Sequence, residues 1–119
     1  GVATVREADG LALSSRNAYL SAPDRERALA IARGLSAAVR DYESGERRVS
    51  ALRRTVAAHV EPATDSIDYI ELATADDVQP FAEDQRIDSR ALLAVAARIG
   101  GTRLIDNVVL GEDSAPMGR

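Results

Sequence analysis

The sequence contains no cysteine and no lysine, and its single histidine is His59. Without cysteine, the chain has no disulfide, no thiolate nucleophile and no thiolate metal ligand. Without lysine, it can supply neither a Schiff base nor a lysine general base, and all its basic residues are arginines. With one histidine and no thiolate, the metals that such a chain can hold are hard cations with oxygen ligands.

Aromatic residues, excess positive charge and long apolar runs are also scarce. Aromatic residues make up 3% of the chain and the formal net charge is -4, which argues against base stacking and general nucleic-acid binding. No apolar run approaches the ~20 residues of a membrane helix, and nothing at the start resembles a signal peptide. We therefore expect no membrane partner and a cytoplasmic location.

The residues that are present predict one domain with a helical pair. The chain has 119 residues, of which 45% are hydrophobic and 29% charged, which is typical of a single soluble domain with a core. Ser21 is the expected N-cap of a helix, with Pro23 in its first turn. Its apolar positions recur at helical spacing, namely Ala28, Ala32, Leu35, Val39 and Tyr42. A second helix is predicted from Val49 to Val60, which makes a helical hairpin.

The remaining segments predict a small antiparallel sheet. Residues 2–8 and 67–72 are rich in β-branched residues and predict strands. Residues 92–98 are alanine-rich and compatible with a helix, but Gly100-Gly101 between two apolar runs favours a β-hairpin over 90–110. Residues 76–89 are expected to be loop, and the tail from Gly111 is expected to be frayed. The fold class is α+β, with about three strands packed against a helical hairpin.

The stretch DGLALSSRN, from Asp9 to Asn17, has two explanations. Serine and asparagine side chains after a glycine turn commonly cap the turn and the nearby backbone. The same hydroxyls, with the planar guanidinium of Arg16, also suit the oxygens of a phosphate, just ahead of a helix N-terminus. The residues alone leave both explanations open.

Other polar residues give weaker signals. His59 lies between apolar positions of the second helix without an evident acidic partner, so we expect a surface or boundary histidine. Arg98 and Arg103 flank the Gly-Gly turn and either meet an anion or pair with acidic neighbours. Asp106 and Asn107 are candidates for buried polar groups that hold the hairpin in place.

Three segments together resemble the C-terminal domain of the pantothenate synthetase (pantoate–β-alanine ligase) family. They are VREADGLALSSRNAYLS at 5–21, IDYIEL at 67–72 and LLAVAARIGGTRLIDNVVL at 92–110. The resemblance implies the lid domain of a ligase of the nucleotidyltransferase superfamily. Such an enzyme joins pantoate to ATP as pantoyl adenylate, and β-alanine then displaces AMP to give pantothenate. It implies ATP as substrate, and Mg²⁺.

The resemblance also implies the residues that hold ATP. The LSSR segment is similar to the KMSKS loop of class I aminoacyl-tRNA synthetases. The implied contacts are the backbone near Leu13, the hydroxyls of Ser14 and Ser15, the guanidinium of Arg16, and the backbone of Val5 at the adenine. Arg16 is then also the catalytic residue that stabilises charge on the departing pyrophosphate. Leu13 stands where many members have methionine, which conserves side-chain volume.

Other features of the family are not found in these 119 residues. The sequence contains no HxGH motif and no lysine that could meet the phosphates. We therefore expect residues 1–119 to be the C-terminal domain of a longer two-domain enzyme, inactive alone. Pantoate and β-alanine would bind a Rossmann-like N-terminal domain, through which the enzyme would form a homodimer. The competing hypotheses are a free-standing anion-binding or interaction module and a structural helical-hairpin adaptor.

Overall fold

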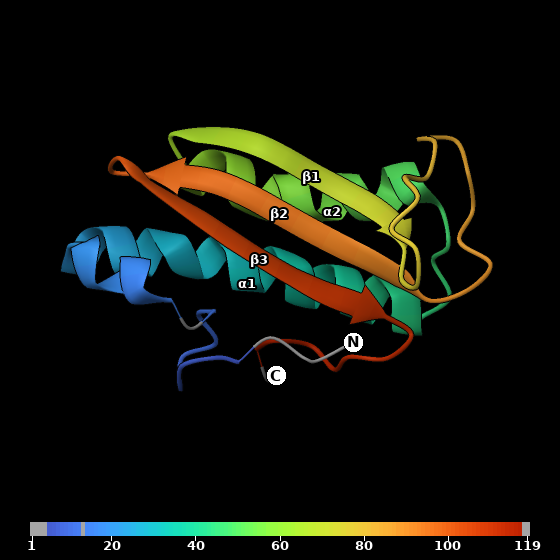
Figure 1. Ribbon diagram of the computed structural model, residues 1–119, viewed down its shortest axis with the longest axis horizontal. Coiled ribbons are helices and arrows are strands. Elements are labelled where there is room, and N and C mark those ends of the chain that lie inside the picture. The colour runs from blue at the N-terminus through green and yellow to red at the C-terminus, as the bar shows by residue number, and fades with distance from the viewer. Residues whose placement is uncertain (1–4, 13, 118–119) are drawn as a thin grey trace.

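The computed structural model describes residues 5–12 and 14–117, without the side chain of Ser15. The described chain forms two layers, with two antiparallel helices behind a three-stranded sheet (Figure 1). Its principal extents are 40 × 27 × 24 Å. The N-terminal segment and the segment after the last strand run side by side along one edge of the sheet (Figure 1), where Met117 lies next to Gly10. The α+β class predicted from the sequence is therefore confirmed.

Helix α1 (Ala22–Glu43) begins where the sequence predicts. The Ser21 side chain accepts a hydrogen bond from the backbone N–H of Asp24, and Pro23 lies in the first turn, where no intrahelical N–H is required. The predicted apolar stripe faces the core, since Ala28, Ala32 and Leu35 are all fully buried. The helix ends before Gly45, which has a φ of +111° that a glycine adopts without strain.

Helix α2 (Val49–Val60) packs antiparallel against α1 and buries its predicted apolar positions, including Leu52 and Val56. The two helices approach closely at Gly34. A Cβ atom at that position would lie 3.1 Å from the carbonyl oxygen of Val56 and 3.3 Å from the Cβ of His59. A short 3-10 helix, η2 (Glu61–Ala63), then leads to the sheet.

The sheet is an antiparallel meander of β1 (Ser66–Thr74), β2 (Ala91–Ile99) and β3 (Thr102–Leu110), in that order. Gly100 and Gly101 both have positive φ angles and form the tight turn between β2 and β3, as predicted. The β-hairpin interpretation of residues 92–98 is therefore correct, and the helical one is wrong. Alternating residues such as Leu93, Val95 and Val108 face the helices and are buried, while Ile105 on the opposite face is 44% exposed.

Two local predictions are wrong. Residues 5–8, the described part of the strand predicted over 2–8, form an isolated bridge between Arg6 and Ala12 instead of a strand. The cause is the turn at Asp9-Gly10, which folds the segment back on itself through bonds from Glu7 N–H to the carbonyl of Leu11 and from Gly10 N–H to that of Glu7. The tail is not frayed up to Met117, whose N–H donates to Ser36 Oγ at 2.8 Å.

Candidate functional site

A cavity of about 210 Å³ lies between the DGLALSSRN stretch and the edge strand β3. Its polar lining comes from Ser14, Arg16 and Asn17 on one side and from Arg103 and Asp106 on the other. Its apolar lining is Leu11, Ala12, Ile31, Leu104 and Ile105. The cavity is therefore a mixed site, with apolar walls and guanidinium groups among its lining residues, which suits a ligand that carries both an apolar and an anionic part.

The residues expected to hold ATP are only partly brought together at this cavity. Ser14 caps the 3-10 helix η1 (Ser15–Tyr19), and its Oγ accepts a hydrogen bond from the N–H of Arg16 at 3.2 Å. Arg16 is exposed, and its Nη1 donates to the carbonyl of Arg103 at 3.3 Å. Val5 is 63% exposed and is not among the lining residues. Leu13 and the Ser15 side chain lie outside the described part of the chain.

The turn-closing explanation of this stretch holds for its asparagine. Asn17 is buried, and its Nδ2 donates to Glu7 Oε2 at 2.5 Å and to the carbonyl of Ala12 at 2.9 Å. Its Oδ1 is buried and has no hydrogen-bond partner among the described residues. Asn17 therefore ties η1 back onto the turn that precedes it, while Arg16 next to it remains exposed.

Glu7 and Arg25 extend this network, and no spacing in the sequence signals either of them. Arg25, on the first turn of α1, donates to Glu7 at 2.8 Å and to Asp9 at 3.1 Å. The hydrogen bond from Arg25, and next that from Asn17, hold the pKa of Glu7 below its usual range. The bond to Glu7 in turn raises the pKa of Arg25. These ion pairs anchor the start of α1 to the turn at Asp9-Gly10.

Asp106 is the buried polar residue anticipated on the last strand, and its partner is Arg6. Its carboxylate oxygens accept from the Nη1 and Nη2 atoms of Arg6 at 2.6 and 2.8 Å. The Asp106 side chain is only 4% exposed, and that of Arg6 is 15% exposed. Burial raises the pKa of Asp106, and the bond from Arg6 offsets only part of that effect. The pair joins two segments one hundred positions apart in the sequence.

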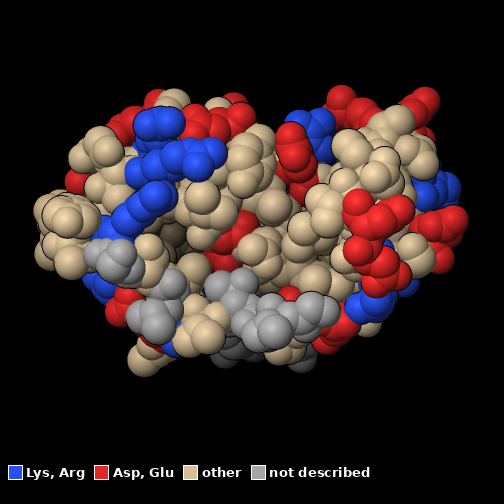
Figure 2. All heavy atoms as spheres, viewed as in Figure 1, with Lys and Arg blue, Asp and Glu red and all other residues tan. Residues whose placement is uncertain are grey.

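A band of basic side chains lies at the end of the sheet where β2 turns into β3 (Figure 2). Arg98 and Arg103 face each other across this turn, and both donate through Nε to the carboxylate of Asp68, at 3.3 and 2.8 Å. The bond from Arg103, followed by that from Arg98, lowers the pKa of Asp68. Pairing with an acidic neighbour is therefore the role that the structure gives to both arginines. Arg16 joins this band through its bond to the carbonyl of Arg103.

The other candidates lie away from the cavity. His59 is exposed on α2, as expected for a surface histidine. Within residues 5–12 and 14–117, no three histidine, aspartate or glutamate side chains gather in a way that could hold a metal ion. In the same residues, no helix has both the length and the apolar character needed to cross a membrane.

The fold recurs as one domain inside larger enzymes of known structure. The crystal structure of pantothenate synthetase from Thermus thermophilus is similar over 99% of this chain, with a TM-score of 0.75 and 33% sequence identity. The match takes in 40% of that chain. The class defined by the fold is therefore an α+β domain similar to the one found within that synthetase.

The sequence comparisons name the family. The pantoate-beta-alanine ligase family profile matches residues 1–109. A pantothenate synthetase of Citrifermentans bemidjiense is 47% identical over 95% of this chain and 40% of its own length. Pantothenate synthetase 1 of Bradyrhizobium diazoefficiens is 48% identical over 92% of this chain and 38% of its own length. The chain belongs to the pantoate–β-alanine ligase family, and it spans about two fifths of the length of these relatives.

Proposed function

We propose that these residues form the C-terminal lid of an ATP-dependent ligase that joins pantoate to β-alanine. Membership of the family supports this proposal, together with the 40% share of the Citrifermentans relative that the chain spans. A larger N-terminal domain, which would bind pantoate and β-alanine, would supply the rest. The phosphate loop, defined here as residues 12–17, would close over ATP bound between the two domains.

The reaction would have two group transfers. A carboxylate oxygen of pantoate attacks the α-phosphorus of ATP, the bond to the bridging oxygen breaks, and pyrophosphate leaves with the electron pair. The amine of β-alanine then attacks the acyl carbonyl carbon of pantoyl adenylate, loses a proton and expels AMP. Negative charge grows on the departing pyrophosphate in the first step, so a guanidinium placed there stabilises the transition state.

Arg16 is the residue that we assign to this task. Its guanidinium is exposed at the cavity and donates to a neutral carbonyl, which a phosphate would outcompete as a charged acceptor. Ser14, Ser15 and the backbone near Leu13 would add donors, and the backbone of Val5 would contact the adenine. A lid of this kind also shields the reactive acyl adenylate from water.

The remaining partners would lie outside these residues. In the described part of the chain no three acidic or histidine side chains gather in one place, so these residues offer no all-protein cage for Mg²⁺. We propose that Mg²⁺ would be bound through the ATP phosphates and the N-terminal domain. We further propose that the complete enzyme works in the cytoplasm as a homodimer formed by that domain.

The experiment is Arg16→Ala in the complete ligase, measured as pantoate-dependent exchange of pyrophosphate into ATP. We expect the rate to fall by about 10²- to 10³-fold, the scale for losing a donor that stabilises transition-state charge. Arg33→Ala is the matched control, since Arg33 is a surface arginine of α1 that pairs with Glu26. The 119 residues alone should show no turnover. An Arg16→Ala enzyme as fast as the control would remove Arg16 from the mechanism.

A further inference from the structure

We propose that Asp106, acting through Arg6, is a positioning residue that fixes the phosphate loop against β3. The inference rests on the proposed function, because it assumes that Arg16 meets the phosphates of ATP. Asp106 lines the cavity beside the loop, and it would act on Arg16 through a chain of contacts.

The Asp106–Arg6 pair is poorly explained as a source of stability alone. Asp106 occupies an inward position of β3, in a row with the buried apolar residues Leu104, Val108 and Leu110. An apolar side chain would continue that row. Removing two charges from water offsets much of what their attraction contributes, and replacing a buried ion pair by apolar residues is often neutral or stabilising. A directional pair at this place therefore suits the task of fixing one geometry.

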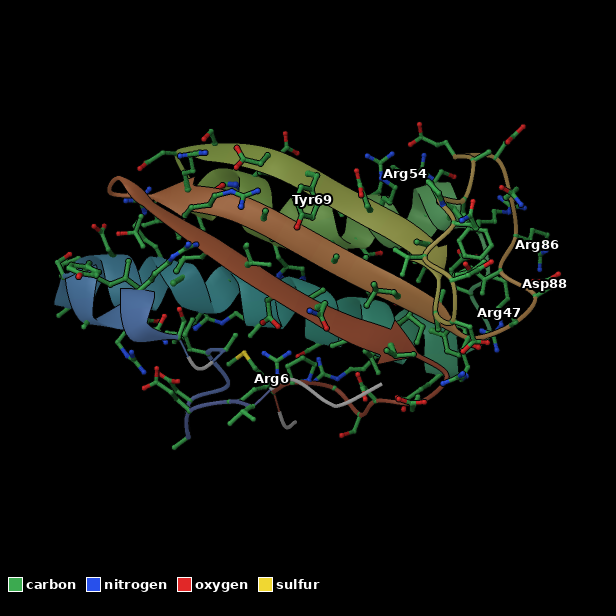
Figure 3. The ribbon with its side chains drawn as sticks, viewed as in Figure 1. Arg6, Arg47, Arg54, Tyr69, Arg86 and Asp88 are labelled. Carbon is green, nitrogen blue, oxygen red and sulfur yellow. The ribbon has the colours of Figure 1, made fainter. Side chains whose placement is uncertain are left out.

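Arg6 carries the constraint from Asp106 into the turn. Besides its two bonds to Asp106, the guanidinium donates to the carbonyl of Gly10 at 3.0 Å and to that of Asn107 at 3.3 Å. The backbone of Arg6 also bridges to Ala12. Arg6, in the N-terminal segment, lies along the free edge of β3 (Figure 3). One side chain thus holds both arms of the turn at a fixed place on the strand.

The turn at Asp9-Gly10 also fixes the position of Arg16. Asn17 follows Arg16 in the sequence. Its side-chain amide donates hydrogen bonds to the carbonyl of Ala12 and to the carboxylate of Glu7. At its other end the Arg16 guanidinium reaches the carbonyl of Arg103. The phosphate loop is therefore attached to β3 at residue 103 through Arg16 itself, and at residues 106 and 107 through Arg6, which pairs with Ala12. Misplacement of a reacting group by about 1 Å can slow catalysis by 10²-fold, so such an attachment has consequences for rate.

The test is the apolar double variant Arg6→Met/Asp106→Leu in the complete ligase. We expect an unchanged or higher melting temperature, since no buried charge is left unpaired. We also expect pantoate-dependent pyrophosphate exchange to fall by about 10- to 100-fold. Glu26→Leu/Arg33→Met is the matched control, which makes the same kind of replacement in a surface pair of α1 and should leave the rate unchanged.

A double-mutant cycle with Arg16→Ala separates positioning from a general structural defect. If Asp106 and Arg6 act through Arg16, adding Arg16→Ala to the apolar variant should give nearly the same rate as Arg16→Ala alone. The inference would be overturned if the fold losses in rate of Arg16→Ala and of the apolar variant multiplied in the combined variant. It would also be overturned if the apolar variant folded and kept the normal rate. If the apolar variant does not fold, Asp106→Asn, which keeps the shape, takes its place in the cycle. A normal rate for Arg16→Ala alone would remove Arg16 from the mechanism and overturn this inference with it.

Discussion

Substitution of Gly34 tests how closely the two helices pack. Alanine is favoured over glycine in a helix by about 1 kcal/mol, so Gly34→Ala would stabilise an isolated α1. In the folded chain, however, the added Cβ would lie 3.1 Å from the carbonyl oxygen of Val56 and 3.4 Å from its Cα. Both atoms belong to the backbone of α2, so no flexible side chain can move aside. Overpacking of this kind costs about 1–3 kcal/mol.

The two effects together predict a net loss of up to about 2 kcal/mol in the free energy of unfolding for Gly34→Ala. Gly34→Val should lose more, because valine gains less helix propensity than alanine and adds two further methyl groups at the contact. Urea unfolding followed by circular dichroism measures both. Ala58→Gly, at an exposed position of α2, is the control, and should lose about 1 kcal/mol from helix propensity alone. A Gly34→Ala chain stabilised by the full propensity difference would refute the close approach.

Two further predictions concern the loss of stability at low pH and the attachment of the C-terminal tail. The pKa of Glu7 is lowered in the folded chain, so its contribution is present above its ordinary pKa of 4.5 and is lost as the pH falls through the folded value. We therefore expect Glu7→Gln to lower the melting temperature near neutral pH, and the difference from the wild type to shrink below pH 4.5. Melting temperatures measured between about pH 3 and 7 test this, and a difference that stays constant with pH would contradict it. Ser36→Ala removes the acceptor of the Met117 N–H and should cost about 1 kcal/mol. Hydrogen exchange at Met117 should accelerate, and unchanged protection would mean that the tail is held elsewhere.

Local signals were enough to predict most of the secondary structure. The Ser21 cap, the apolar spacing in both helices and the glycine pair at 100–101 each act within a few residues, so a pattern in the sequence reports them directly. The strand predicted over 2–8 failed because a strand needs a neighbour as well as propensity. After residues 5–8 the chain turns back at Asp9-Gly10, and Arg6 pairs with Ala12 of the same segment.

The supports of the candidate site were beyond such patterns. The hydroxyls of Ser14 and Ser15 and the guanidinium of Arg16 stand out in the sequence as groups that suit a phosphate. The family resemblance implied that they hold ATP. Arg6 and Asp106 are one hundred positions apart, and no periodicity connects them. Glu7 likewise meets Asn17 and Arg25 only once the N-terminal turn has folded against η1 and the start of α1. A single sequence indicates which residues carry charge, whereas the tertiary fold decides which of them pair.

The loop between β1 and β2 lies at the opposite end of the sheet from the phosphate loop. It leaves β1 after Thr74 and returns at Ala91, whereas Arg103 follows the turn at the far end of β2. A nine-residue strand separates the two ends by roughly 25 Å. We therefore expect that residues can be added to or removed from the loop between β1 and β2 without moving the residues around Arg16. A fluorophore attached at the exposed Asp88 would report on movement of the whole domain while leaving the phosphate loop undisturbed (Figure 3).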